Sequence, residues 1–318
     1  MTNRQTNHEP KHSNKAPAPS HFKEFNGYDS YCNPTDYNAG GEAVLSGRIS
    51  QKRLESLAEN LSKKDQNILS TLRHCRYATT KQLQHLYFTD AKTSPAGLRA
   101  ANRNTNKLKK MGLLAALSRR IGGVRAGSGS FIWYLTQAGE RLLRLTGGGA
   151  HASRRFFEPS PHFLAHTLAV SECFVQLKQI CSGHTPKLVN VEFETDCWRP
   201  YNHKGTQTTL RPDLFATTTC EDKYEDRWFF EVDLKTEAPV TVIEKCYRYH
   251  QYYRSGLEQK LHNVFPLTVW IVPDIARKDS LTSYLRAEFA KLPKLFIIIT
   301  PDELAPLIQQ GIKRSSLC

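Results

Sequence analysis

Residues 62 to 87 carry hydrophobic side chains at the spacing of two short amphipathic helices. In SKKDQNILSTLRHC the isoleucine and the leucines fall on one helical face, and Ser62 is a suitable N-cap. In ATTKQLQHLYF, Thr79 or Thr80 caps a second helix whose leucines and tyrosine share a face. A turn of two residues separates the two segments. This spacing is typical of a helix-turn-helix.

A third amphipathic helix follows in GLRAANRNTNKLKKMGLL. Its apolar positions recur at helical intervals, at Leu98, Ala101, Thr105, Leu108 and Met111. Beyond Gly112, two strand-like runs are joined by a loop rich in Gly and Arg, and QAGERLLRL forms a closing helix. Three helices followed by a basic hairpin are the order of a winged helix-turn-helix domain, whose third helix enters the major groove of DNA.

The polar side of the third helix and the basic hairpin supply the candidate DNA contacts. Arg99, Arg103, Asn104 and Lys107 are predicted to reach base edges, with Lys110 on the same outward side. The hairpin adds three candidate phosphate ligands, Arg119, Arg120 and Arg125. We therefore expect double-stranded DNA as the partner of this region.

The chain after residue 158 has a mixed helix and strand pattern. A buried helix in SPHFLAHTLAVSECFVQLKQIC precedes three strand candidates, KLVNVEFET, TTLRPDLFATT and DRWFFEVDLK. A helix in PVTVIEKCYRYHQYYRSG, a strand in FPLTVWIVPD and a further helix and strand complete the order. The order αβββαβ with a mixed sheet is that of a PD-(D/E)xK nuclease-like domain. The whole chain is therefore predicted to be α+β.

These patterns predict four regions. Residues 1–50 are rich in Asn, Ser, Pro, Gly and His and predict a disordered leader, because they offer few apolar side chains to bury. Residues 51–146 form the expected winged helix domain, and 147–158, with the glycines of TGGGAHAS, the linker. Residues 159–318 form the expected nuclease-like domain.

The stretch RWFFEVDLKTE carries charged residues at every second position. In an extended strand, the side chains of Glu231, Asp233, Lys235 and Glu237 would share one face, and the hydrophobic residues would share the other. Two interpretations fit this alternation. The charged face lies in water, or it forms part of an ion site.

The second interpretation predicts a metal-dependent nuclease centre. Asp213 of RPD precedes Glu231 and Asp233 by one strand, and carboxylates bind the hard cations Mg²⁺ or Mn²⁺ that hydrolysis of a phosphodiester requires. Lys235 would stabilise developing charge. The motif can consist of Asp213 with Asp233-Leu234-Lys235, or of Asp213 with Glu231-Val232-Asp233, and both registers stay open. The candidate catalytic residues are thus Asp213, Glu231, Asp233 and Lys235, with the three acids as metal ligands.

Further candidates lie in the flanking helices. Lys245 and Tyr249 fall at a spacing that lets them share a helical face with Tyr252, for binding or for packing alone. Glu172 is a candidate acid in the preceding helix, or an exposed helix residue.

Charge is concentrated in the first predicted domain. Residues 51–150 hold 18 Lys and Arg against 5 Asp and Glu, a net charge of +13 out of +14 for the chain, which favours a polyanionic partner. No apolar run approaches the length of a membrane helix and no signal peptide is present, so a cytoplasmic protein is expected. The eight cysteines and twelve histidines show no metal-binding spacing.

The chain resembles the replication-relaxation family of plasmid and mobile-element proteins. The resemblance covers roughly residues 60 to 300 and rests on ATTKQLQHLYF, LKKMGLL, WYLTQAGERLL, HTLAVSE, LRPDLF and FFEVDLKTE with IEKCYRYHQYY. It implies a DNA-processing role in replication, relaxation or mobilisation, with other replication or mobilisation proteins as partners. His166 matches the family's HTLAV. Lys235 departs from the small residue expected before Thr236.

Two functions remain in competition at this point. One is a metal-dependent endodeoxyribonuclease or nickase, and the other is a DNA-binding accessory factor or transcriptional regulator with an inactive nuclease-like scaffold. A tyrosyl relaxase is disfavoured because no histidine triad accompanies the tyrosines. Homodimerisation, common among winged helix proteins, stays open because no heptad or apolar stripe indicates it.

Overall fold

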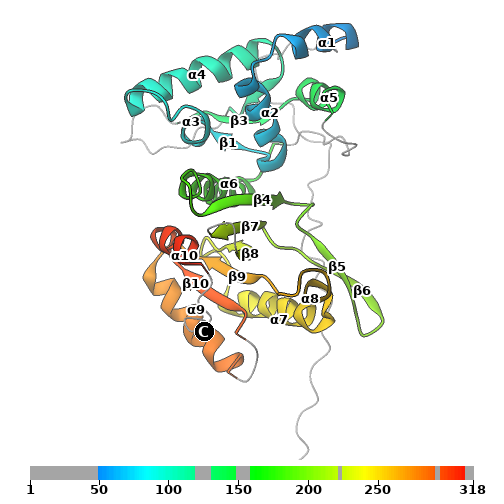
Figure 1. The fold of residues 1–318 in the computed structure, drawn as a ribbon, viewed down its shortest axis with the longest axis vertical. Coiled ribbons are helices and arrows are strands. Elements are labelled where there is room, and N and C mark those ends of the chain that lie inside the picture. Colours follow the sequence, from blue (N-terminus) through cyan, green and yellow to red (C-terminus); the bar gives the residue numbers. More distant parts are fainter. Residues whose placement is uncertain (1–48, 119–129, 148–157, 221–223, 291–293, 312–318) are drawn as a thin grey trace, which may run out of the picture. The chain divides into compact units, whose positions relative to one another are not determined.

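The first half of the chain builds a small antiparallel sheet among helices in this computed structural model. The structure describes residues 49–118, 130–147, 158–220, 224–290 and 294–311, and all of them belong to one compact unit. The elements of the first half, in chain order, are α1 (Gln51–Glu59), α2 (Lys63–Cys75), β1 (Ala78–Thr79), α3 (Thr80–Tyr87), α4 (Ser94–Lys110), β2 (Leu114–Ala116), β3 (Ile132–Leu135) and α5 (Gln137–Leu145). The strand order is β1-β3-β2, with both pairs antiparallel (Figure 1).

The predicted helix caps are confirmed. Ser62 caps α2, and its side chain and backbone exchange hydrogen bonds with Asp65 in a capping box. Thr79, not Thr80, caps α3 in the same way through Gln82. Helix α1 was not predicted, although Ser50 caps it. The predicted leader otherwise lies outside the described residues.

Helix α4 packs through a face slightly different from the predicted one. Gly97, Ala101, Thr105 and Leu108 are buried, while Leu98 is 37% exposed, so the expectation that Leu98 packs in the core is wrong. The reason is the close approach at Gly97, where an added Cβ would lie 2.9 Å from the carbonyl oxygen of Phe88. The helix is rotated to bring its smallest residue, and not Leu98, against α3.

The second half of the chain builds a mixed five-stranded sheet. Its elements are α6 (Pro161–Ile180), β4 (Lys187–Phe193), β5 (Arg199–His203), β6 (Thr206–Leu210), β7 (Leu214–Cys220), β8 (Tyr224–Val232), α7 (Pro239–Ser255), α8 (Leu257–His262), β9 (Leu267–Ile271), α9 (Ile275–Glu288), β10 (Phe296–Ile299), the 3₁₀ turn η1 (Pro301–Glu303) and α10 (Leu304–Gln310). The order is β10-β9-β8-β7-β4. The β4, β7 and β8 pairs are antiparallel, and β9 and β10 continue the sheet in parallel. The predicted α+β class and mixed sheet are confirmed.

The segment TTLRPDLFATT is divided between two strands. Its first residues end β6, which pairs with β5 in a separate hairpin, and the residues after Asp213 form β7 of the main sheet. The predicted single strand is therefore wrong. Asp213 stands at the junction, directly before β7 begins.

Both faces of the main sheet are covered. Trp228 and Phe230 of β8 pack in a core with α6 and α10, whereas Phe229 packs with α7 and α9 on the other side (Figure 1). The charged face of β8 is consequently not in water, and Glu231 has no exposed surface. The parallel strand β9 requires a crossover, and its helix α7 covers that face.

Hydrogen bonds join the two halves of the described unit. The side-chain Nε2 of Gln82 on α3 donates two hydrogen bonds to α6. One goes to the carbonyl oxygen of Leu168 at 2.9 Å and the other to the carboxylate of Glu172 at 3.0 Å. The hydroxyl group of Ser171 donates to the carbonyl oxygen of Tyr77 at 2.9 Å. Helix α6 thus contacts the helical half on one side and the sheet on the other.

Candidate functional site

Asp213, directly before β7, and Glu231 on β8 are neighbours across the sheet. The register pairs Leu214 with Phe230, and the backbone N–H of Asp213 donates to the carbonyl oxygen of Phe230 at 3.2 Å. Residues directly opposite in an antiparallel pair point their side chains to the same face. Both carboxylates therefore point to the face covered by α7.

Lys245 on α7 lies between these two carboxylates. Its ammonium group donates a very short hydrogen bond to Oε2 of Glu231 and lies 3.9 Å from Oδ1 of Asp213. One helical turn further, the hydroxyl group of Tyr249 donates to Oε1 of Glu231. Since Tyr252 instead donates to Glu258, only Lys245 and Tyr249 of the helical candidates reach the acids.

His166 holds the other side of Asp213. Its Nε2 lies 3.2 Å from Oδ2 of Asp213, and the same oxygen accepts from the backbone N–H of Val232 at 2.8 Å. Burial alone would lower the pKa of His166, but the negative charge of Asp213 raises it to about 9. The imidazole ring is therefore protonated at neutral pH.

The two acids differ in their proton affinity. Burial would raise the pKa of Asp213, but Lys245 and His166 outweigh this effect and hold the pKa well below its usual range. Burial also raises the pKa of Glu231, and there Lys245 and Tyr249 only reduce the rise. Two neighbouring carboxylates whose environments drive their pKa values apart are a frequent feature of functional sites.

Asp233 and Lys235 are directed away from Asp213. The Nε of Arg277 on α9 donates to Oδ2 of Asp233 at 2.6 Å, and the backbone N–H of Lys235 donates to Oδ1 at 2.9 Å. The ammonium group of Lys235 contacts Asp274 at 3.1 Å and its side chain is half exposed. Because β8 ends at Val232, the strand periodicity that grouped these residues stops before them. Glu231 is thus the acid beside Asp213, and Glu172 is occupied by Gln82.

Asp213 and Glu231 are the described carboxylates that could act as ligands of a divalent cation. Oδ1 of Asp213 and Oε2 of Glu231 face the same point, where the Lys245 ammonium group already supplies positive charge. Magnesium is commonly held by one or two carboxylates and keeps several waters. Among the residues that the structure describes, no group of three or more His, Cys, Asp or Glu is arranged to hold a metal. The donor set therefore suits two protein ligands, without Asp233.

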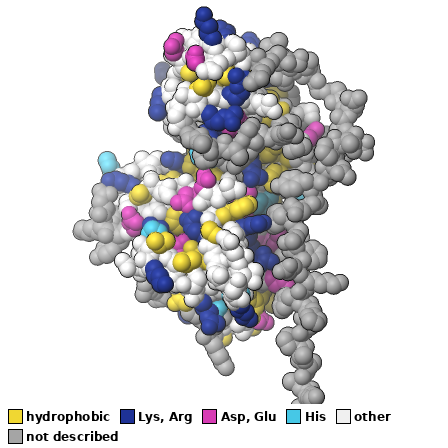
Figure 2. Space-filling model, turned by 90° about the vertical axis from the view of Figure 1, so that its right-hand side faces the viewer, with side chains coloured by type: hydrophobic (Ala, Val, Ile, Leu, Met, Phe, Trp, Pro, Cys, Tyr) yellow, Lys and Arg dark blue, Asp and Glu magenta, His cyan; other side chains and the backbone are white. Residues whose placement is uncertain are grey.

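Part of the predicted DNA-contacting set lies on an exposed stripe of α4. Arg99, Arg103 and Lys110 are exposed and, with Asn106, follow one another at intervals of four, three and four residues. Lys and Arg side chains also lie on the upper part of the face shown in Figure 2, the part formed by α1 to α5. The hairpin candidates Arg119, Arg120 and Arg125 lie outside the described residues.

Asn104 and Lys107 both bind the carboxylate of Asp65 on α2. The Nδ2 of Asn104 donates to Oδ1 of Asp65 at 2.8 Å, and the ammonium group of Lys107 donates to Oδ2 at 2.6 Å. Asp65 is fully buried at the start of α2. These two residues anchor α4 to α2, so the exposed stripe without them is the better candidate for contact with DNA.

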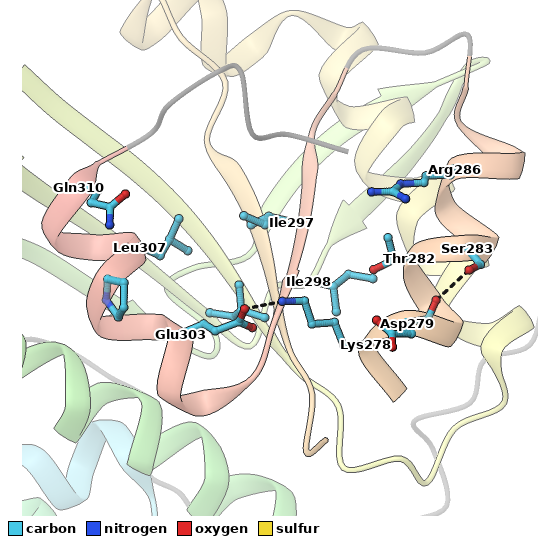
Figure 3. A pocket seen from close by; sticks show the side chains of 12 residues that line it. Lys278, Asp279, Thr282, Ser283, Arg286, Ile297, Ile298, Glu303, Leu307 and Gln310 are labelled. Atoms are coloured by element: carbon cyan, nitrogen blue, oxygen red, sulfur yellow. Dashed lines mark hydrogen bonds and ion pairs between the residues drawn. The ribbon is translucent and has the colours of Figure 1, made fainter. Parts of the chain in front are cut away.

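A larger cavity lies elsewhere, along the edge of β10. It has a volume of about 740 Å³ and lies between α9 and α10, with Ile297 at its floor and the Lys278 to Glu303 ion pair at one side (Figure 3). Asp213, Glu231 and Lys245 do not line it. The larger cavity is thus not where the ionisable groups converge. We take the convergence of Asp213, Glu231 and Lys245 as the candidate site. In the described part of the chain, no helix is both long and apolar enough to cross a membrane.

The fold and the site define an α+β protein with an acid pair and a lysine at one end of a mixed sheet. Residues 69–268 match the replication-relaxation family, and the chain belongs to this family. The match includes α4, Asp213, Glu231 and Lys245. Comparison with curated proteins and with solved structures gave no match.

Proposed function

We propose that this protein binds duplex DNA and cuts it at the Asp213 and Glu231 pair, as an endonuclease or nickase in the replication, relaxation or mobilisation of a plasmid or mobile element. The observation that carries the proposal is the convergence of two carboxylates from neighbouring strands on Lys245. Membership of the replication-relaxation family supports a role in replication, relaxation or mobilisation. The geometry of the acid pair and Lys245 supports cleavage of a phosphodiester.

The element order supports two domain assignments within the unit. In residues 51–146, helices α2, α3 and α4 followed by β2 and β3 have the order of a winged helix domain. In residues 159–318, helix α6, strands β4, β7 and β8, helix α7 and strand β9 have the order of the PD-(D/E)xK core. The motif lysine then comes from α7, as Lys245. Of the predicted linker, residues 147–158, all but the first and last lie outside the described residues.

Each residue of the site has a distinct task in this proposal. Asp213 and Glu231 would hold Mg²⁺ or Mn²⁺, which when bound polarises a phosphoryl oxygen and lowers the pKa of a bound water. Lys245 stabilises the negative charge that develops on the phosphate group in the transition state. Tyr249 and His166 hold the carboxylates in position through the hydrogen bonds described above.

The exposed stripe on α4 supplies the proposed DNA contact. Arg99, Arg103 and Lys110 extend over about three helical turns, a length that suits the major groove and its flanking phosphates. They contribute three of the 18 Lys and Arg side chains of residues 51–150.

A second function is favoured by one specific observation. Arg277 neutralises Asp233, and the ammonium group of Lys245 bonds to Glu231 at the point where a cation would lie. This arrangement also suits a protein that binds DNA without cutting it and presents the sheet domain to other replication or mobilisation proteins.

Incubation with supercoiled plasmid and Mg²⁺ or Mn²⁺ tests the nuclease directly. The wild type is expected to produce nicked or linear DNA, and Asp213→Asn and Glu231→Gln are expected to lose at least 100-fold in rate. Asp274→Asn is the matched control and should keep full activity, because it changes a half-exposed acid paired with Lys235 and asparagine can still cap α9. Equal inactivity of the wild type and both variants across several DNA substrates would leave the accessory function.

Salt-dependent binding tests the α4 stripe independently of cleavage. Arg103→Ala should weaken binding to duplex DNA and lower the slope of log K against log salt by about 0.9 for one lost phosphate contact. Lys260→Ala removes one exposed charge on α8 and serves as the control. If both variants change the slope equally, the stripe is not the DNA-binding surface.

A further inference from the structure

A small cavity with both polar and apolar lining adjoins Asp213, and Glu231 does not line it. Its volume is about 40 Å³, room for roughly one to three waters or for the oxygens of one phosphate group, and too little for a base. Asp213 and His166 line it from the sheet domain, Glu194 from the residue after β4, and Arg76 from the end of α2. Both halves of the described unit therefore contribute charged side chains to it.

Strand register explains why Glu194 reaches this place. Phe193 pairs with Leu214, so the next antiparallel position brings Glu194 beside Asp213. The Nη2 atom of Arg76 lies 3.3 Å from Oε2 of Glu194. An arginine side chain has five N–H donors in a planar fork, so this contact leaves others for a second anion.

The fold holds Arg76 in an uncommon backbone conformation. It is the C-cap of α2, with φ of 64°, in the left-handed region that a residue other than glycine seldom adopts. Its guanidinium group lies 5.7 Å from the centre of the Phe163 ring on α6. Backbone conformations of this kind concentrate at functional sites, where the surrounding structure maintains them.

Each acid around this point is matched by a cation from a different helix or its end. Asp213 has His166 of α6, Glu231 has Lys245 of α7, and Glu194 has Arg76. Such an arrangement lets an incoming anion bind without facing an excess of negative charge. Of the three cations, Arg76 has the planar fork that matches a phosphate group bidentately.

We propose that Arg76 binds a backbone phosphate of the DNA at this cavity, next to the acid pair. This inference rests on the proposed function for its substrate, and it adds a substrate-binding residue that comes from the DNA-binding half of the chain. The domain that binds the duplex thereby also completes the cleavage site. Cutting would then depend on the contact between α2 and the residue after β4 as well as on the acid pair.

Inorganic phosphate, without metal or DNA, tests the site alone. At low millimolar concentration, where its general salting-out effect is small, phosphate should raise the melting temperature of the wild type more than sodium chloride of equal ionic strength does, because a ligand of the folded state stabilises it. Arg76→Ala should abolish this additional rise. Arg53→Ala, which removes an exposed charge on α1, should retain it. Arg76→Lys should retain part of it, with a roughly threefold to tenfold weaker apparent affinity, and replaces Arg76→Ala if the latter does not fold.

The comparison of the two salts distinguishes phosphate binding by Arg76 from a purely structural role of Arg76. If the role were structural, Arg76→Ala would change the melting temperature equally in phosphate and in sodium chloride. A full phosphate-dependent rise in Arg76→Ala, or none in the wild type, overturns the inference. In the plasmid assay, Arg76→Ala should lower kcat/KM at least tenfold, mainly through a higher KM for the plasmid, because the lost phosphate contact is already made in the bound substrate. A wild type that never cuts overturns the proposed nuclease, whereas the phosphate experiment still decides the role of Arg76.

Discussion

Replacement of Asp65 by alanine is expected to destabilise the helical half strongly. Asp65 is fully buried and accepts hydrogen bonds from the backbone and hydroxyl groups of Ser62, from Asn104 and from Lys107. It therefore closes the capping box of α2 and ties α4 to it. An alanine would leave four donors without this acceptor.

The loss can be estimated from the surroundings of each donor. The capping interaction contributes about 1 kcal/mol. The bond from the largely buried Asn104 to a charged acceptor contributes about 1.5 kcal/mol. The pair with Lys107 is discounted to about 0.5 kcal/mol because the lysine side chain is 43% exposed and regains water. Together they amount to about 3 kcal/mol, or a decrease of about 6 °C in melting temperature for a unit of this size.

Chemical and thermal unfolding of Asp65→Ala, with Asp90→Ala as the control, measures this loss. Asp90 forms an exposed pair with Lys64 at 3.8 Å, so its replacement should cost less than about 0.5 kcal/mol. Asp65→Asn keeps one acceptor oxygen and should fall between the two. Equal stability of the Asp65→Ala and Asp90→Ala variants would refute the argument.

The same residue has a defined pH dependence. Burial would raise the pKa of Asp65, but hydrogen bonds from Lys107, Ser62 and Asn104 outweigh it and lower the pKa below the usual 3.8. Its contribution is therefore complete above about pH 4, where the unfolded chain also has the group ionised, and is lost as the pH falls further. The stability difference between wild type and Asp65→Asn should be constant from pH 7 to pH 5 and should shrink below pH 4. A difference that grows on acidification would contradict this sign.

Two further substitutions test packing and the buried ion pair. Gly139→Ala should cost about 2 kcal/mol in unfolding free energy, because the added Cβ would lie within 2.6 Å of a leucine side chain, whereas Gly183→Ala, with open space around it, should be neutral. Arg277→Met should cost about 3 to 5 kcal/mol by leaving Asp233 buried without its partner, and addition of Asp233→Leu should restore most of the loss. If the double variant is as unstable as Arg277→Met, the unpaired charge of Asp233 is not the cause of the loss.

Local sequence signals predicted most of the fold. Ser62 and Thr79 begin their helices where capping residues precede apolar periodicity, and the order of helices and strands in the second half follows from the hydrophobic runs. Asp213 and Glu231 are candidates from sequence because carboxylates in two successive predicted strands, within the predicted αβββαβ order, can hold a hard cation. These features depend only on neighbours along the chain.

The errors arise where distant segments decide the outcome. The division of TTLRPDLFATT depends on whether each part pairs with β5 or with the main sheet, and the sequence around it is uniformly strand-like. The separation of Asp233 from the site depends on Arg277, which is 44 residues away. The choice of Lys245 over Lys235 depends on where the crossover helix packs. No sequence pattern indicates Arg76 as a site residue, because its place beside Glu194 follows from the contact between the two halves.

Binding of Mn²⁺, followed by the loss of its free electron paramagnetic resonance signal, tests the central claim most directly. Convergence of Asp213 and Glu231 on one point predicts one bound ion per chain in the wild type. Asp213→Asn and Glu231→Gln should each weaken binding at least tenfold, and Asp233→Asn should bind like the wild type because its carboxylate faces Arg277. No bound ion in the wild type, or a loss confined to Asp233→Asn, would contradict the account.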